Sequence, residues 1–136
     1  MKMQNAKGTF AVTITPEHHD AAPPGGTPTM RMKLSKTFTG DFIGTAEGTM
    51  LSAGSLTPGN AAAYVAIDQV TGTLAGEAGG FMLVHRGTID KNGASDLSVI
   101  IAPGSGTGAL EGISGSLAIE RRDGQHLYDL AYVLPD

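Results

Sequence analysis

The stretch TGALEGISGSLAI at residues 107–119 decides the fold, because its pattern occurs elsewhere in the chain. Residues 71–83, TGTLAGEAGGFML, keep the pattern TGxLxGxxG before an apolar run, and residues 39–44, TGDFIG, keep its first half. The three starts are 32 and 36 residues apart, which is about two strands with their turns. Glycine supplies the positive φ angles of tight turns. The repeat therefore predicts turns at one rim of a meander barrel.

The run PGSGTG at 103–108 has an alternative interpretation as a phosphate-binding loop. In such loops a helix follows the glycines, and its N-terminal amides and dipole hold the phosphate. Here a strand-like run follows instead of a helix. We therefore interpret these glycines as turn residues.

Most of the chain is typical of β-strands, because apolar and β-branched residues alternate between Gly, Pro, Asn and Asp boundaries. No window carries the apolar stripe of a long helix, although residues 54–64 could hold a short helical turn. The short links favour antiparallel neighbours, and the longest loop is expected at 16–28. The predicted fold class is all-β, a closed antiparallel meander barrel of about eight strands with little helix. The strand runs are Gly8–Thr15, Thr29–Phe38, Phe42–Leu51, Tyr64–Leu74, Phe81–Ile89, Asp96–Ala102, Ser116–Arg121 and Leu127–Leu134.

Both faces of the predicted strands are apolar. In the run 64–74, Val65 and Ile67 lie on one face, and Ala66 and Val70 lie on the other. One face fills a barrel, and the other must be buried against a helix or another subunit. We therefore expect a homo-oligomer, either a dimer or a trimer.

Length and composition set the remaining bounds. The 136 residues are the size of one domain, and we expect a single barrel domain over 1–136 with residues 1–6 as a frayed N-terminus. The absence of Cys excludes disulfides, thiolate metal sites and a cysteine nucleophile. No signal-peptide core or membrane-length apolar run is present, so a cytoplasmic location without membrane contact is expected. The net charge of −4, with scattered Lys and Arg, disfavours nucleic acid as a partner.

The C-terminal run GSGTGALEGISGSLAIERRDGQHLYDLAYVL resembles the C-terminal segment of the allene oxide cyclase and dirigent protein group. The runs KTFTGDFIGTAEGTML, AAAYVAIDQVTGTLAGEAGGFMLVHRGTI and APGSGTGALEGISG are similar to a family of small bacterial proteins of undetermined function with that barrel. The resemblance covers residues 7–134. It implies an eight-stranded antiparallel barrel with a central cavity, often in an oligomer.

The resemblance implies less about catalysis. Allene oxide cyclases place a Glu and an Asn on the first strand, facing an apolar cavity in which a fatty-acid epoxide closes a ring. Here Thr13, Ile14 and Thr15 fall near those positions, and the nearest carboxylate, Glu17, follows Pro16. The carboxylate position of that family is therefore not matched.

Tyr64, Asp68 and His85 are the main candidate site residues, because they share one strand face. If residues 75–78 form the hairpin turn, Asp68 lies opposite His85; a register shift by two residues places His85 opposite Ala66 or Val70. A carboxylate that orients an imidazole is a common arrangement for proton transfer. The alternative is that the two side chains only satisfy each other inside the core.

Other candidates depend on which face lines the lumen. Phe81 and Leu83 accompany His85 as apolar ligand-binding residues, and Lys36 and Glu47 are polar candidates on the neighbouring hairpin. The alternative for Lys36 and Glu47 is an exposed surface charge. The EHHD cluster at 17–20 is interpreted as a solvated loop and not as a metal site, because adjacent side chains of an extended segment diverge.

Two functions from different classes follow. The first is a protein that holds a small apolar or amphipathic molecule in the barrel, oriented by Tyr64, Asp68 and His85. The second is an isomerase or cyclase in which Asp68 and His85 move a proton. A third possibility is a structural oligomer without a ligand. No cofactor and no metal are predicted.

Overall fold

The structure is a computed structural model that describes residues 2–55 and 57–135. Within these residues the regular structure is entirely β, which confirms the predicted fold class. The strands are β1 (Gln4–Asp20), β2 (Thr29–Gly40), β3 (Phe42–Gly54), β4 (Ala62–Leu74), β5 (Glu77–Ile89), β6 (Ser95–Ile101), β7 (Thr107–Gly108), β8 (Ser114–Arg122) and β9 (Gln125–Val133).

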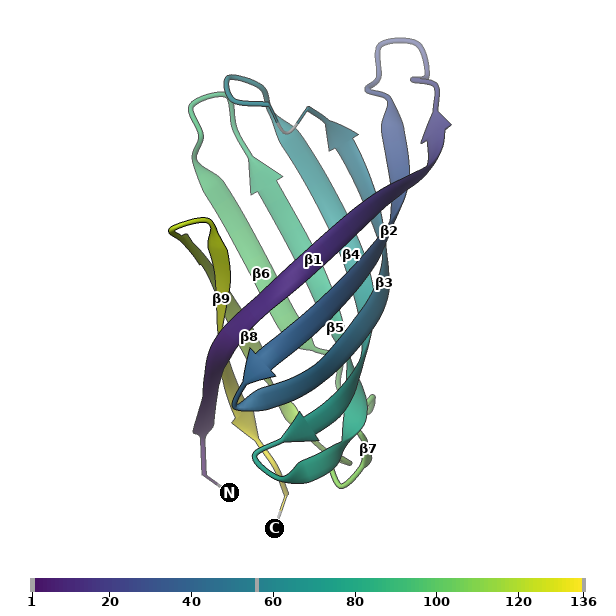
Figure 1. Cartoon of the computed structure of the whole chain (residues 1–136). Helices are drawn as coiled ribbons and strands as arrows, with labels where there is room; N and C mark the ends of the chain where they lie inside the picture. The colour runs from purple at the N-terminus through teal and green to yellow at the C-terminus, as the bar shows by residue number, and fades with distance from the viewer. Residues whose placement is uncertain (1, 56, 136) are drawn as a thin grey trace.

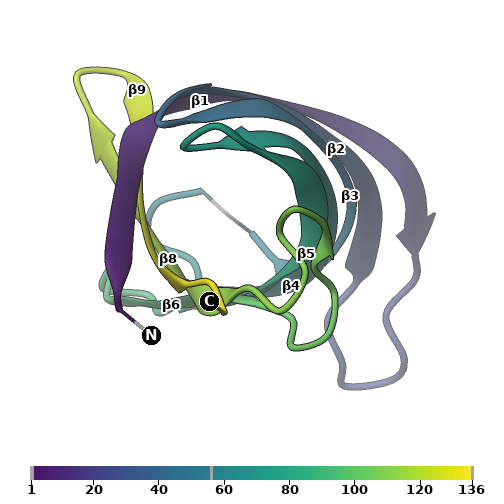
Figure 2. The ribbon, with the colours of Figure 1, turned by 90° about the horizontal axis from the view of Figure 1, so that it is seen from below.

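The strands form a closed antiparallel barrel. The sheet order is β4-β3-β2-β1-β9-β8-β6-β5, and pairing between β4 and β5 closes the ring. The two-residue strand β7 is an addition on the β5 edge. Figure 1 shows the barrel from the side, and Figure 2 shows the ring of strands from the end where both termini lie. We call this the lower end.

The repeated TG segments meet at the lower end, as predicted (Figure 1). The amide of Ala75, in the β4–β5 turn, donates to the carbonyl of Asp41 in the β2–β3 turn at 3.2 Å. The amide of Ala109, in the third segment, donates to the carbonyl of Ala78 at 2.8 Å. Gly40 (φ +100°) and Gly108 (φ +61°) supply the backbone angles that these turns need.

The β4–β5 hairpin has a tighter turn than the one first considered. Ala75 (φ +49°) and Gly76 (φ +87°) form a two-residue turn with positive φ at both positions, which suits the twist of a hairpin. Leu74 therefore pairs with Glu77. Asp68 lies opposite Leu83, and His85 lies opposite Ala66, so the register shifted by two residues is the one that forms.

The ends of β1 also differ from the prediction. The prediction of a frayed segment is wrong from Gln4 onward, because Gln4 pairs with Tyr132 and Ala6 is buried. At its other end β1 continues through the EHHD cluster to Asp20, with an irregularity between Pro16 and His18. The helical turn suggested within 54–64 is absent from the described residues there.

The interior contains two apolar clusters. The lower cluster is aromatic at its centre, where the Phe38 ring lies 5.4 Å from Phe10, 5.4 Å from Phe42 and 5.7 Å from Tyr128. The upper cluster consists of Met32, Leu34, Met50 and Ala66, with Val12, Met30 and Tyr64 packed against it. These clusters define the position of the candidate site.

The upper half of the barrel is open on one side. β1 pairs with β9 only from Gln4 to Phe10, and β6 pairs with β8 at Ile100 and Ser116 alone within the described residues. The tip of the β8–β9 hairpin diverges from the wall (Figures 1 and 2). As a result, the inward-facing Ile14 and Leu97 remain 48% and 42% exposed. On the outer face Val65 and Ile67 are also about half exposed in the single chain.

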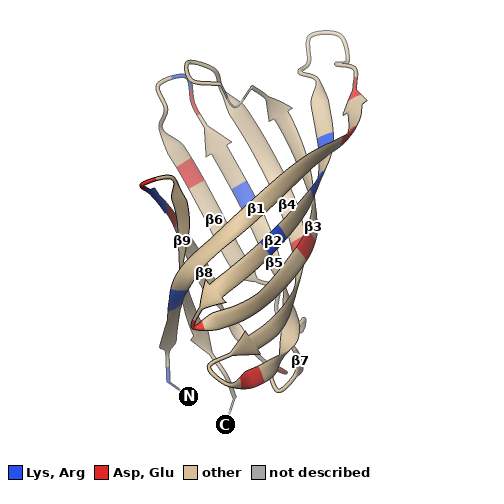
Figure 3. Ribbon diagram, in the orientation of Figure 1, with Lys and Arg blue, Asp and Glu red and all other residues tan. Residues whose placement is uncertain are grey.

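Charged residues are scattered over several strands and do not gather into a stripe along the ribbon (Figure 3). Residues 2–55 and 57–135 contain no helix that is long and apolar enough to span a membrane.

Candidate functional site

Lys36, Asp68 and His85 meet inside the barrel, and we call them the polar layer. They come from β2, β4 and β5. Asp68 Oδ2 accepts a hydrogen bond from Lys36 Nζ at 2.5 Å and another from His85 Nε2 at 2.9 Å. Asp68 is fully buried, and the exposed fractions of His85 and Lys36 are 3% and 7%. In the described part of the chain these are the buried charged or polar side chains.

Glycines on the inner face leave room for the site residues. Gly48 lies opposite Asp68, and a Cβ atom at Gly48 would be only 2.1 Å from Asp68 Oδ1. Gly87 lies opposite Tyr64, and its Cβ atom would be 2.3 Å from Tyr64 Cε1. Both side chains therefore lie flat against the wall, over a glycine. The sequence interpretation missed Gly48, whose signal was a glycine within an otherwise regular strand.

The polar layer holds Asp68 in its ionised form. Burial alone would raise the pKa of Asp68, but the hydrogen bond from His85 and the positive charge of Lys36 outweigh it, so the pKa lies below its ordinary value. An ionised carboxylate only accepts hydrogen bonds, so His85 Nε2 carries a hydrogen. In the neutral ring Nδ1 then has a free lone pair, and it makes no hydrogen bond within the described residues.

The polar layer keeps hydrogen-bonding groups that its own contacts do not use. Lys36 Nζ has three N–H groups, of which one donates to Asp68. Its positive charge lies 5.6 Å from the centre of the Phe10 ring, a favourable cation–π distance. Asp68 Oδ1 is buried without a hydrogen-bond partner in the described structure, next to Gly48. The layer can therefore donate through Lys36 and accept through His85.

The lowered pKa predicts how stability depends on pH. In the unfolded chain Asp68 titrates near its ordinary pKa of about 3.9, whereas its pKa in the folded protein is lower. Its contribution to the free energy of unfolding is complete above the unfolded value and is lost as the pH falls from there through the folded pKa. We expect urea unfolding curves measured between pH 7 and pH 3 to show this loss. A decline just as steep in Asp68→Asn would contradict the assignment.

Tyr64 lies on the same inner face, as predicted, and is half-buried. Its pKa is raised, first by burial and then by the negative charge of Asp68, so the phenol stays protonated and can donate. It makes no hydrogen bond to Asp68 or His85. Tyr64 is thus a wall residue above the polar layer and not a member of it.

The other predicted residues separate into two groups. Phe81 and Leu83 lie in the lower cluster, where the remaining space is only about 10 Å³, so they pack in the core and line no ligand cavity. Glu47 is exposed on the outer face, where it accepts a hydrogen bond from Ser35 Oγ at 3.1 Å. The surface-charge alternative therefore holds for Glu47 and is wrong for Lys36.

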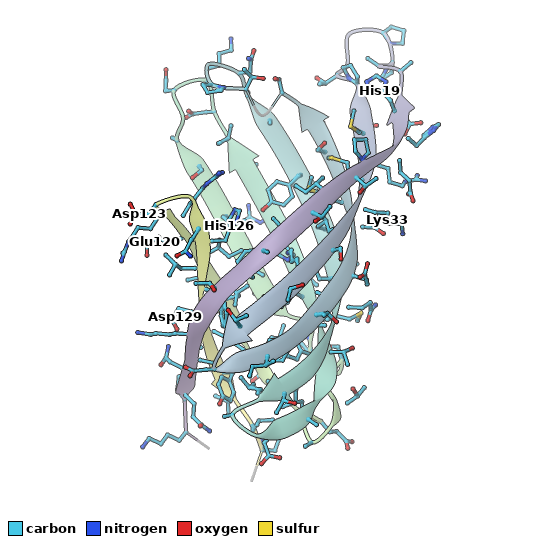
Figure 4. All side chains as sticks on the ribbon, in the orientation of Figure 1. His19, Lys33, Glu120, Asp123, His126 and Asp129 are labelled. Carbon is cyan, nitrogen blue, oxygen red and sulfur yellow. The ribbon has the colours of Figure 1, made fainter. Side chains whose placement is uncertain are left out.

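Open space lies above the polar layer. A cavity of about 610 Å³ at the upper mouth is lined by Met30, Met32, Ser52 and His19, among others. A smaller hollow of about 150 Å³ is lined by Tyr64, Gly87 and Leu97, among others. Figure 4 shows His19 near the upper end of β1, far from His126. The walls of this half are mainly apolar.

The EHHD cluster extends β1, and His18, His19 and Asp20 pair with β2. His18 Nε2 lies 2.8 Å from Asp20 Oδ1, and both side chains are exposed. Among the residues that the structure describes, no three His, Cys, Asp or Glu side chains come together as metal ligands. The cluster is a strand end, and the prediction of a loop at these residues is wrong.

Comparison with known proteins supplies the family. The family model described as "Protein of unknown function (DUF3224)" matches residues 6–132. The chain belongs to the DUF3224 family. A crystal structure of a DUF3224 protein of unknown function from Shewanella oneidensis MR-1 is similar to this DUF3224 chain, with 38% sequence identity and a TM-score of 0.89. The match covers 99% of this chain and 100% of the other. No curated protein matches this DUF3224 chain significantly.

Proposed function

We propose that this protein binds a small, mostly apolar molecule with a neutral polar head group in the upper half of its barrel. The observation that carries this proposal is the polar layer beneath an open, largely apolar cavity. Such cavities with a few converging polar groups are typical of ligand sites. The volume of about 610 Å³ at the mouth lies within the usual range for them.

Methionines make the upper half adaptable. Met30, Met32 and Met50 belong to or pack against the upper cluster, between the mouth and the polar layer. Methionine side chains are unbranched and rearrange at low cost, so they suit irregular apolar ligands. In the proposal they move aside when the head group of the ligand reaches Lys36 and His85.

The charge of the polar layer favours a neutral head group. Lys36 and ionised Asp68 balance each other, so this ion pair carries no net charge. A further buried charge without a partner costs several kcal/mol. A hydroxyl group fits without that cost, because its oxygen accepts from Lys36 and its hydrogen is donated to His85 Nδ1.

Matched ligands and variants test the proposal. Displacement of an environment-sensitive naphthalene dye by 1-decanol and by decanoate at pH 8 compares two head groups on one tail. We expect decanol to bind about tenfold more tightly or better, a difference of at least about 1.4 kcal/mol. Ala66→Leu fills the upper cluster and should weaken decanol binding, whereas Ala63→Leu, on the outer face of the same strand, should not. Absence of binding, or equal effects of the two variants, would refute the assignment.

A second candidate is the isomerase or cyclase suggested by the allene oxide cyclase-like resemblance. The Asp68–His85 hydrogen bond favours it, because an oriented imidazole is a suitable base. With a β,γ-unsaturated ketone, His85 Nδ1 would take the α-proton while the electron pair moves onto the carbonyl oxygen, which Lys36 stabilises. The same proton then returns to the γ-carbon. If so, His85→Gln abolishes isomerisation of the ketone, whereas Ala63→Leu, on the outer face, leaves it unchanged. Isomerisation that survives this substitution would exclude His85 as the base.

A further inference from the structure

We infer that the free edge of β1, residues Ala11–Thr15, pairs with the same segment of a second copy of this chain. β1 pairs with β2 along this segment, but on its other side pairing with β9 stops at Phe10. The backbone groups on that side therefore have no strand partner within the described structure. This assignment is independent of the ligand proposal.

The edge lacks the usual protection against pairing. Natural edge strands carry charges, prolines or bulges that prevent association with another strand. Residues 8–16, GTFAVTITP, contain no charged side chain. Pro16 and the adjacent irregularity mark the upper end of the segment, but nothing comparable interrupts Ala11–Thr15. Four of these five residues are β-branched and therefore favour a strand.

The sequence of this edge is complementary to itself. An antiparallel pair with its two-fold axis at Thr13 places Val12 opposite Ile14 of the partner subunit, and Ala11 opposite Thr15 of the partner subunit. The Val–Ile pairs lie on the inner face, where Ile14 is 48% exposed in the single chain. Apolar β-branched pairs on one face stabilise neighbouring strands. The dimer thus covers both the unpaired backbone and the exposed Ile14.

Structural limits at both ends fix the register. Below the segment, the edge position at Phe10 is already paired with His126. In the two-fold arrangement Pro16 of the partner subunit would fall beside Phe10, and proline has no N–H for pairing. The segment Ala11–Thr15 is therefore the longest stretch that can pair about Thr13.

The outer face is a weaker choice of interface. Val65 and Ile67 are exposed there, but their backbone is already paired on both sides by β3 and β5. Leu51, opposite Val65, is exposed beside them, so this face offers apolar contact area but no unpaired backbone. The β1 edge combines an exposed apolar side chain with unpaired backbone, so it gains more from a partner.

Cysteine cross-linking tests the register, because the chain has no native Cys. Thr13→Cys places two thiols at the axis, where opposed Cα atoms of an antiparallel pair are about 4.5–5.5 Å apart, within the range for a disulfide. We expect mild oxidation to convert most of Thr13→Cys into a covalent dimer on a non-reducing gel. The control Thr37→Cys, exposed on β2, should stay mainly monomeric. Equal cross-linking of both variants would overturn the proposed register.

Sedimentation of cysteine-free protein tests the interface itself. We expect a dimer at about 100 μM, far above the Kd of a specific interface in the micromolar range. Ile14→Lys should give a monomer with an unchanged circular dichroism spectrum, and Ile67→Lys should remain a dimer. A monomeric unmodified protein, or a dimer lost in Ile67→Lys but kept in Ile14→Lys, would refute the proposal.

Discussion

Asp68→Asn is expected to lower the free energy of unfolding by about 3–5 kcal/mol at pH 7, because removal of one partner leaves a buried charge unpaired. The substitution keeps the shape of the side chain but removes the negative charge that faces Lys36 and His85. Lys36 has an exposed fraction of only 7%, so water compensates little of this loss. Urea unfolding measures the change. A loss below about 1 kcal/mol, the range of an exposed pair, would contradict the buried geometry.

Two further variants separate charge from packing at this position. Asp96→Asn removes an exposed carboxylate that lies 3.6 Å from Arg86, and it should change stability by less than about 0.5 kcal/mol. Adding Lys36→Met to Asp68→Asn removes the unpaired positive charge and should restore part of the lost stability, because apolar replacements of buried ion pairs are often tolerated. A double variant as unstable as Asp68→Asn would show that the unpaired charge is not the cause.

Phe38→Ala is expected to cost about 3–5 kcal/mol, the usual loss for a large aromatic side chain in a packed core. Phe38 is 4% exposed and contacts the rings of Phe10, Phe42 and Tyr128 at the centre of the lower cluster. The space now left in this cluster is about 10 Å³, so its side chains are already tightly packed. They have little freedom to move into the cavity that Phe38→Ala would create. Urea unfolding of Phe38→Ala beside Thr37→Ala, an exposed neighbour, measures the effect. Similar losses in both variants would contradict a core position for Phe38.

The barrel could be predicted from sequence because its turns require special residues. Glycines of the repeated segments, as at Gly40, Gly76 and Gly108, reflect positive φ angles that other residues adopt poorly. The hairpin register was less predictable. Ala75 occupies a position with φ +49° that Asn, Asp or Gly usually fill, so nothing in its identity indicates a two-residue turn.

The candidate site was predictable within the β4–β5 hairpin, because both registers considered put Tyr64, Asp68 and His85 on one face. The alternation that places Asp68 inside also places its i±2 neighbours there. The faces of Lys36 and Glu47 could not be predicted together, because these residues lie on β2 and β3. A change of one residue in the turn between the strands moves every side chain of one strand to the opposite face of the sheet. In the structure Glu47 pairs with Ser35, and Lys36 pairs with Ala46, so one side chain is inside and the other outside.

The role of Gly48 and the free edge of β1 could not be read from the chain alone. The role of a glycine within a strand can be recognised only when its neighbour on the next strand is known. For Gly48 that neighbour is Asp68. Likewise, the nine-residue length of β9 matters only in comparison with the 17-residue β1 beside which it folds.

Because β8 and β9 are short, the barrel wall is continuously paired at the lower end and unpaired along one edge of β1 in the upper half. At the lower end, pairing between β1 and β9 closes the barrel around the aromatic side chains of the lower cluster. Above Phe10 β1 has no pairing with β9 in the described structure, whereas β2–β5 remain paired with one another along their length. If the proposed ligand binds in the upper half, this unpaired edge lets the wall adjust to its width while the packed lower end stays closed.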